Sequence, residues 1–376
     1  MGRTSLFCMV GLLVSAAACG SDGGKDETDD GPGPGPSDLD SGTPDGSGPI
    51  IGDLDATLRP DSTLATPDAA ADGGDVIVGM DGSIVGGASC ADGFPRGVAS
   101  ATRREVRATM PTIEGVAACP NGDVFVSAAS LSQVWRIPFA GGEPEVWYSQ
   151  STGLFAGLTC DDNNRLFAAD YGFTDPGGVV QITGKGAGTP LPRPADFATQ
   201  GYNGVLVIEG IGIFASDTAA GRIVVWRADA NGALVAQTAV SGVGGANGLA
   251  RGTDGRLYVA LTATLGDNEV VSFAVGNDGK LEDRKSAWKG PNIVDGIAID
   301  ENNTLYVAFY SEGKIVRASD GATVATAKNP ASLVFRGGTL LYSDYDVFGS
   351  QAEKVSGQIS TTGYLYAVDL AVCGAN

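Results

Sequence analysis

The chain has no histidine among its 376 residues, and this absence removes several classes of catalytic site. Without an imidazole there can be no Ser-His-Asp triad, no Cys-His dyad and no His-ligated zinc. A Gly-x-Ser-x-Gly nucleophile elbow is missing as well. Beyond Cys19 there is no apolar run long enough for a membrane-spanning helix. The sequence therefore predicts neither histidine-based chemistry nor a transmembrane helix.

Basic residues are also scarce, with 24 Lys and Arg against 44 Asp and Glu, which gives a net charge of −20. Residues 20–97 hold 16 acidic but only three basic residues and are rich in Gly, Asp, Pro, Ser and Thr. Such a segment cannot bury enough apolar surface to offset its ordering entropy, so we expect a disordered acidic tether. The negative charge argues against a nucleic-acid partner.

Residues 1–19 resemble a bacterial lipoprotein signal. Arg3 supplies a positive start, Leu6–Val14 is a short apolar core, and small residues precede Cys19. An ordinary signal peptide is the alternative, because Ala16 stands where Leu is commonest in a lipobox. We expect Cys19 to be lipidated, and the protein to be exported and held at the bacterial cell envelope by its lipid alone.

Four cysteines follow the predicted signal, namely Cys90, Cys119, Cys160 and Cys373. An even number in an exported protein favours two disulfides, for which three pairings exist. We prefer Cys90–Cys373, which would join the two ends of the folded domain, and Cys119–Cys160, which would join neighbouring repeats. Four buried free thiols are the alternative. No two cysteines are close enough in sequence to suggest a metal site.

One pattern occurs six times between Glu114 and the C-terminus: a variable residue, a small residue, an apolar stretch, a tight turn, and a strand ending near an aromatic residue. The six opening pairs are Glu114-Gly115, Ala156-Gly157, Asn203-Gly204, Asn247-Gly248, Asp295-Gly296 and Ala331-Ser332. Hairpin-turn signals follow at Asn121-Gly122, Asn163-Asn164, Gly210 to Gly212, Asp254-Gly255, Asn302-Asn303 and Gly337-Gly338. The strand-end residues are Phe125, Phe167, Phe214, Tyr258, Tyr306 and either Leu341 or Tyr342.

The pattern returns roughly every 40 residues, which is the period of a four-stranded propeller blade. A third strand follows in every unit, centred on Val134, Val179, Ile223, Val270, Ile315 and Leu365. No stretch has a competing helical periodicity. Residues 98–376 therefore predict an all-β fold, a six-bladed β-propeller that we expect to be a monomer. Arg104 to Ala108 should form an outer strand that completes the last blade.

Two other motifs are interpreted as loops. The glycine cluster from Gly184 to Gly188 has no helix after it and so lacks the setting of a phosphate-binding loop. The stretches Asp161 to Asn164 and Asp300 to Asn303 lack the alternation and the closing Glu of an EF-hand. Each also falls where the repeat requires a hairpin turn.

Four of the six opening residues carry a side-chain oxygen: Glu114, Asn203, Asn247 and Asp295. If the repeats form a ring, these oxygens point at one axis. Two carboxylates and two amide oxygens suit Ca²⁺ or a similar hard divalent cation. Ordinary turn residues are the alternative for any one Asn-Gly or Asp-Gly pair. Because all four occupy one register of the repeat, we predict a single axial metal site.

These residues also carry a family resemblance. The segments Glu114-Gly115, Asn247 to Ala250 and Asp295 to Asp300, followed by Leu305 to Ala308, resemble the regucalcin/gluconolactonase/luciferin-regenerating-enzyme family. That family comprises six-bladed propellers with one axial metal, held by a Glu, two Asn and an Asp in this chain order. The resemblance implies a small-molecule lactone or ester as substrate and a hydrolase in which the metal binds the carbonyl oxygen. It also implies that Asp295 is the general base.

The sequence departs from the family beside the second ligand. In the sugar-lactone enzymes a basic and an acidic residue flank that ligand, whereas here Tyr202 precedes Asn203 and Gly204 follows it. The alternative function is a non-catalytic surface or periplasmic binding module, because a propeller fold does not by itself define a function. An open metal position would favour the hydrolase, and an axial channel plugged by aromatic side chains would favour the binding module.

Overall fold

The computed structural model describes residues 76–78, 84–86, 102–110, 113–138, 143–172, 177–193, 201–262, 268–336, 338–345 and 363–370. The predicted signal with Cys19, most of the predicted tether, Cys90, Cys373 and Gly337 lie outside these residues. Within them no helix is long and apolar enough to cross a bilayer.

Two short strands lie inside the segment for which the sequence predicts disorder. Strand β1 (Val76–Val78) pairs antiparallel with β2 (Ile84–Gly86). Both consist mainly of Val and Ile, the residues with the strongest preference for strands. Local β-propensity therefore produces a strand pair that the average composition of residues 20–97 did not predict.

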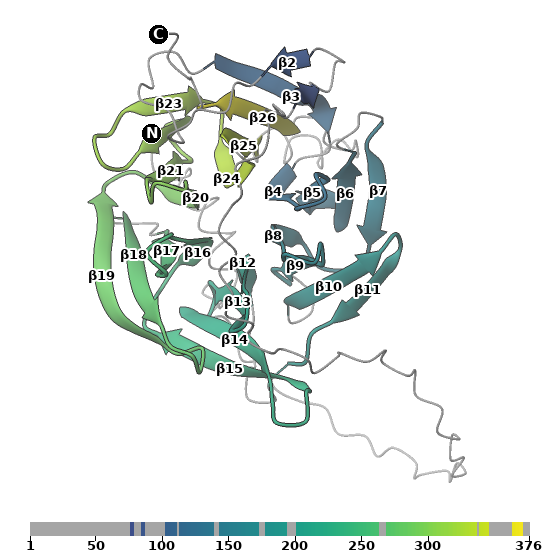
Figure 1. Cartoon of the computed structure of the whole chain (residues 1–376), viewed down its shortest axis with the longest axis vertical. Helices are drawn as coiled ribbons and strands as arrows, with labels where there is room; N and C mark the ends of the chain where they lie inside the picture. The colour runs from purple at the N-terminus through teal and green to yellow at the C-terminus, as the bar shows by residue number, and fades with distance from the viewer. Residues whose placement is uncertain are drawn as a thin grey trace, which may run out of the picture. The chain divides into compact units, whose positions relative to one another are not determined.

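Six four-stranded antiparallel sheets make up the rest of the described chain (Figure 1). The first two contain β4 (Ile113–Ala118), β5 (Val124–Ala128), β6 (Gln133–Ile137) and β7 (Glu145–Ser149), then β8 (Phe155–Cys160), β9 (Leu166–Asp170), β10 (Gly178–Gly184) and β11 (Ala187–Pro190). The next two contain β12 (Tyr202–Ile208), β13 (Gly212–Asp217), β14 (Arg222–Ala228) and β15 (Leu234–Ser241), then β16 (Ala246–Arg251), β17 (Leu257–Leu261), β18 (Asn268–Val275) and β19 (Leu281–Gly290). The last two contain β20 (Val294–Ile299), β21 (Leu305–Phe309), β22 (Lys314–Arg317) and β23 (Thr323–Thr326), then β24 (Pro330–Arg336), β25 (Thr339–Asp344), β26 (Gly363–Asp369) and β3 (Thr102–Met110).

The first strand of each sheet belongs to a closed ring. In order, β4 contacts β8, β8 contacts β12, β12 contacts β16, β16 contacts β20, β20 contacts β24, and β24 contacts β4. The early strand β3 pairs with β26 and completes the last sheet, which confirms the predicted closure. The protein is therefore the six-bladed propeller that the repeat predicts. The helical content of the described residues is one 3₁₀ turn, Ala129–Leu131.

A separate hydrophobic cluster fills each of the six junctions between neighbouring blades. The second strand of a blade has a neighbour on both faces, and β5, β17 and β21 are accordingly buried along their whole length. Phe167 and Phe214, two of the predicted strand-end aromatics, are among the most deeply buried side chains. Burying such a ring contributes about 1.5–3 kcal/mol, so these junctions supply much of the stability.

Every innermost strand has a β-bulge at its second and third residues. In β4 the pairing register shifts between Ile113 and Val116, and the other five innermost strands shift at the same place. The six bulges contain the six opening pairs of the repeat. The opening pairs therefore lie within strands, and the hairpin turns lie at the other ends of those strands. This placement excludes the interpretation of the opening pairs as ordinary turn residues.

The small second residue of each pair is needed because neighbouring blades approach one another here. A Cβ atom on Gly157 would lie 2.6 Å from the carbonyl oxygen of Asn203, and one on Gly248 would lie 2.8 Å from that of Asp295. Neither glycine has a positive φ. Close approach of backbones, rather than an unusual backbone conformation, therefore requires glycine at these positions.

Candidate functional site

The four oxygen-bearing residues are the second residues of four innermost strands. Glu114 lies in β4, Asn203 in β12, Asn247 in β16 and Asp295 in β20. All four line one cavity of about 100 Å³, which residues of all six innermost strands enclose. The cavity therefore lies on the propeller axis, and the structure brings together the residues that the sequence predicted as one site.

Apolar side chains continue the cavity along the strands. Its lining beyond the polar residues includes Leu158, Leu206, Leu249, Ile297 and Val334. The polar groups thus form one layer at the start of the innermost strands. Because the wall beyond that layer is apolar except for Thr159, ions and most hydrogen-bonding groups should bind at the layer itself.

Burial raises the pKa of both carboxyl groups in this layer. The pKa of Glu114 rises to about 8, and the negative charge of Asp295 adds to the effect of burial. Burial raises the pKa of Asp295 to about 7, while a hydrogen bond from Asn247 acts in the opposite direction. No Lys or Arg is among the described residues that line the cavity. Ionising both carboxyls here is costly, and a bound cation would remove that cost.

The amide of Asn247 is held by two neighbours. Its Nδ2 donates to Thr262 Oγ1 at 3.1 Å, and the same side chain is hydrogen-bonded to Asp295. Thr262 Oγ1 in turn donates to the carbonyl oxygen of Val294 at 2.5 Å. These contacts occupy the donor side of the amide and leave Oδ1 as its available atom. The sequence analysis did not identify Thr262, although a hydroxyl residue directly after a second strand was the available signal.

Serines of the second strands hold the ring together. Ser127 Oγ accepts from Gly115 N and donates to the carbonyl oxygen of Ala156 in the next blade, both at 2.7 Å. Ser216 makes the corresponding contacts with Gly204 N and the carbonyl oxygen of Asn247. Ser343 likewise donates to the carbonyl oxygen of Glu114. The opening residues are therefore fixed by their backbones, and sequence reasoning missed these serines because the bridge joins two blades.

A second layer of side chains lies directly beyond the ends of the second strands. Its six members are Ala129, Tyr171, Thr218, Thr262, Tyr310 and Tyr345. In five of the six blades the backbone N–H of this residue donates to a carbonyl just before or at the start of the innermost strand, as from Tyr345 to Asn329 at 2.8 Å. Tyr310 and Tyr345 are each only 7% exposed and pack with Ala156 and Ala331 of the first layer. Aromatic side chains therefore cover part of the ring on this side.

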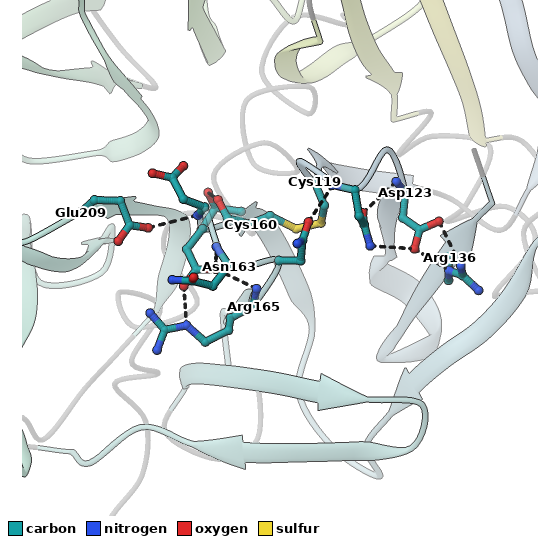
Figure 2. The surroundings of a disulfide bond; sticks show 12 residues. Cys119, Asp123, Arg136, Cys160, Asn163, Arg165 and Glu209 are labelled. Atoms are coloured by element: carbon teal, nitrogen blue, oxygen red, sulfur yellow. Dashed lines mark hydrogen bonds and ion pairs between the residues drawn. A yellow bond between two sulfur atoms is a disulfide. The ribbon is translucent and has the colours of Figure 1, made fainter. Parts of the chain in front are cut away.

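The opposite ends of the first two innermost strands are joined by a disulfide. Cys119 directly follows β4, Cys160 ends β8, and the two are bonded across neighbouring blades with their Cα atoms 5.2 Å apart (Figure 2). The adjacent hairpin turns also touch, since Asn121 N donates to Asn164 Oδ1 at 2.7 Å. This is the pairing that the sequence analysis preferred for these two cysteines.

The first carboxylate of each Asp-rich turn accepts hydrogen bonds from the backbone of its own turn. Asp161 Oδ1 accepts from the backbone N–H groups of Asn163 and Arg165, and Asp300 Oδ1 accepts from those of Asn302 and Thr304. These contacts are local hydrogen bonds that stabilise a turn. They support the interpretation of both segments as hairpin turns.

Two further features limit the chemistry of the axial site. In the described part of the chain, no three Asp, Glu, Cys or His side chains gather in one place, so a metal here would need the amide oxygens of Asn203 and Asn247. Arg193 packs beside Gly178 of the third strand β10 and is not among the residues that line the cavity. The site as described therefore combines two carboxyls, two amides and a second layer in which five of the six side chains carry a hydroxyl.

The family model for the SMP-30/Gluconolactonase/LRE-like region matches residues 114–342 of the sequence, which is more than half of the chain. No curated protein matches the chain. Among solved structures, the chain is similar to the gluconolactonase of Xanthomonas campestris, at 18% identity and a TM-score of 0.56 over 75% of this chain and 92% of that one. It is similar to the calcium-binding protein regucalcin of Agrobacterium tumefaciens, at 16% identity and 0.55 over 73% and 96%. A luciferin-regenerating enzyme aligns at 14% identity and 0.55 over 73% and 98%.

Proposed function

Because the chain belongs to the SMP-30/gluconolactonase/LRE-like family, we propose that it is a divalent-metal-dependent hydrolase of lactones or esters. Family membership supports a lactonase-type function. The observation that carries the metal dependence is that Glu114, Asn203, Asn247 and Asp295 line one axial cavity from the same register of four blades. The substrate is a small molecule with an electrophilic carbonyl group.

The donor set fits a hard cation such as Ca²⁺. Two carboxylates and two amide oxygens match its preference for oxygen ligands. The raised pKa values of Glu114 and Asp295 show that negative charge in this cavity lacks compensation, which a divalent cation would provide. Glu114, Asn203, Asn247 and Asp295 would hold the ion. Once bound, it would act as a Lewis acid on the substrate carbonyl.

Asp295 moves the proton in this proposal. Its carboxylate takes a proton from the water that attacks the carbonyl carbon. When the bond between the carbonyl carbon and the ring oxygen breaks, the protonated Asp295 returns the proton to the departing oxygen. The net reaction consumes one water and yields a hydroxy acid from a lactone. The hydrogen bond from Asn247 orients the carboxylate during both transfers.

A non-catalytic binding module is the second candidate, and one observation favours it. Tyr310 and Tyr345 are buried against Ala156 and Ala331, so aromatic rings cover part of the oxygen layer. The cover is partial, since Glu114 and Asp295 still line the cavity. Catalytic turnover, rather than metal binding, separates the two functions.

The test uses the full chain. Elemental analysis and calcium calorimetry are run on the protein beside an Asn203→Ala/Asp295→Ala double variant, followed by a panel of lactones and esters assayed by acid release. We expect one ion per chain, its loss in the double variant, and hydrolysis that stops on chelation. Metal binding without turnover of any panel member would support the binding module. Hydrolysis that persists after chelation would refute metal dependence.

We also propose that the protein is exported and anchored to the cell envelope through a lipid on Cys19. Support comes from the positive, apolar and small residues that precede this cysteine in the sequence. Radiolabelled palmitate fed to a producing bacterium should label the protein, and Cys19→Ser should abolish both the label and membrane fractionation. A labelled Cys19→Ser protein would refute the anchor.

A further inference from the structure

The axial cavity extends from the oxygen layer toward the hairpin-turn ends of the innermost strands. On the other side of that layer the second layer covers part of the ring, and none of its six residues is among the described residues that line the cavity. Toward the hairpin turns the lining continues as far as Leu206 in β12 and Val334 in β24. A strand advances about 3.3 Å per residue, so this wall reaches roughly 10 Å beyond the layer. A molecule whose carbonyl oxygen lies at the layer therefore finds room for its other atoms along the wall.

Two leucines present apolar surface to this part of the cavity. Leu206 and Leu249 pack on the hydrophobic cluster between the third and fourth blades, yet both are only partly buried. Both line the cavity, so accessible surface of each leucine faces it. Leu249 also lies close to the oxygen layer, because a Cβ atom on Gly204, the residue after Asn203, would lie 3.2 Å from Leu249 Cγ. The apolar wall therefore begins directly beside the oxygen-bearing residues.

The wall offers few partners for a polar group. Beyond the six opening pairs, Thr159 is the only polar side chain among the described residues that line the cavity, and no Lys or Arg is among them. The Thr159 hydroxyl donates to the carbonyl oxygen of its neighbour Cys160 at 3.4 Å. A hydroxyl group buried without a hydrogen bond weakens binding by roughly 5- to 150-fold. A buried methylene, in contrast, strengthens binding by about fourfold.

We infer that the axial site takes lactones or esters with an aliphatic substituent beside the reacting carbonyl, and that Leu206 and Leu249 are the residues that select for it. The inference rests on the proposed function and names its substrate class. The two leucines would contact carbon atoms of the substrate and take no part in the proton transfer. A substrate with several hydroxyl groups would leave them unpaired against this wall and would therefore react poorly.

The experiment compares two lactones of nearly the same size. γ-Hexanolactone carries an ethyl group on the ring, where γ-(hydroxymethyl)-γ-butyrolactone carries a hydroxymethyl group. For the calcium-loaded full chain, kcat/KM is measured with each lactone, and calorimetric affinity is measured with the two corresponding lactams, which resist hydrolysis and report binding alone. Each result is expressed as the ratio of the ethyl to the hydroxymethyl compound. Because both values come from one protein sample, partial unfolding of a variant changes them by the same factor and leaves the ratio unaltered.

Two variants place a hydroxyl in the wall, Leu206→Ser and Leu249→Ser, and either one suffices if the other fails to fold. Leu281→Ser is the matched control. Leu281 belongs to the same hydrophobic cluster as the two wall leucines, but it begins the outermost strand β19 and is not among the residues that line the cavity. Thermal unfolding and calcium affinity are measured for every variant.

In wild type we expect the ethyl compound to be favoured by roughly 10- to 100-fold, both in kcat/KM and in lactam affinity. Leu206→Ser and Leu249→Ser should each reduce this preference by about 3- to 10-fold, which is the effect of one new hydrogen bond to the hydroxymethyl group. Leu281→Ser should keep the wild-type ratio.

Three results would contradict part or all of this reasoning. Hydrolysis in wild type without a preference for the ethyl compound, or with a preference that neither wall variant reduces, would overturn the inference and leave the proposed function standing. A wild-type chain that hydrolyses neither lactone but prefers the ethyl lactam would overturn the hydrolase and keep the apolar wall as a binding surface. Failure both to hydrolyse the lactones and to bind the lactams would overturn both.

Discussion

Replacing Glu114 by Gln should stabilise the metal-free protein, and the gain should grow with pH. In the folded chain the pKa of Glu114 is raised from 4.5 to about 8, chiefly by burial. Between these two values the folded protein keeps a proton that the unfolded chain has released, so its stability falls as pH rises. A glutamine in the same place has similar size and no charge to bury. The variant is therefore freed from a cost that wild type bears at high pH.

The size of the effect follows from the two pKa values. One unit of pKa difference is worth about 1.4 kcal/mol, so the cost of ionising Glu114 is about 1 kcal/mol at pH 5 and about 4 kcal/mol at pH 8. Because Glu114 is partly exposed, solvent reduces this, and we expect a gain on the order of 2–4 kcal/mol at pH 8. Asp295 titrates in both proteins and its charge contributes to the raised pKa of Glu114, so the comparison reports Glu114 together with its interaction with Asp295.

The assay is urea unfolding of the full chain in chelator, followed by tryptophan fluorescence at pH 5 and pH 8. The exposed Glu282 provides a control, since Glu282→Gln should change nothing at either pH. Adding Ca²⁺ at pH 8 should stabilise wild type by RT ln(1 + [Ca²⁺]/Kd) and leave Glu114→Gln almost unaffected. Two results would refute this account of the Glu114 carboxyl. One is an unfolding free energy that Glu114→Gln lowers by the same amount at pH 5 and pH 8, and the other is a stabilisation of the variant by Ca²⁺ as large as that of wild type.

Three further substitutions test the site and its frame. Asp295→Ala should lower lactonase kcat by about 100- to 10,000-fold in a proton-transfer role, with an unchanged far-UV spectrum, and an active variant would exclude Asp295 as the base. Gly157→Ala should lower the unfolding free energy by about 1–3 kcal/mol, because its Cβ would lie 2.6 Å from a backbone oxygen. Gly184→Ala is the control, since a Cβ there would meet open space. Equal losses in the two variants would contradict the packing argument. Cys119→Ser with Cys160→Ser should lower the unfolding free energy by roughly 2–4 kcal/mol for a bridge across 41 positions, and a loss below about 0.5 kcal/mol would show that the bridge constrains little.

The repeat of the sequence predicted most of the fold, because each blade is a local unit. Turn residues such as Gly122 and Asn164 adopt the positive φ expected of hairpin turns, and the second and third strands occur where their apolar centres lie. The sequence left open which residue takes the place of the strand-end aromatic in the last blade, and the pairing register answers this. Val334 pairs with Leu341, at the strand position where Ala117 pairs with Phe125 in the first blade. Leu341, rather than Tyr342, therefore takes the place of the aromatic in the last blade.

The four candidate ligands could be named from the sequence because they share one position in the repeat. The neighbouring sequence does not show why glycine follows these residues. For that reason ordinary turn residues remained an alternative interpretation of the Asn-Gly and Asp-Gly pairs. The structure shows the cause: Gly248 faces the backbone oxygen of Asp295 across a blade junction. The role of Thr262 and the covering of the ring by Tyr345 were also missed, since each joins segments that are distant in the chain.

The sequence by itself determined the number of blades, the early strand that closes the ring and the identity of four oxygen-bearing residues, because period, turn chemistry and side-chain type are local properties of the chain. Only the tertiary structure decided that these residues line one cavity, that burial raises the pKa of Glu114 and Asp295, and that tyrosines stand above the two alanines of the ring. Burial and electrostatic interaction depend on which groups the closure of the ring brings together. The distances between groups of different blades cannot be inferred from the sequence of any single repeat.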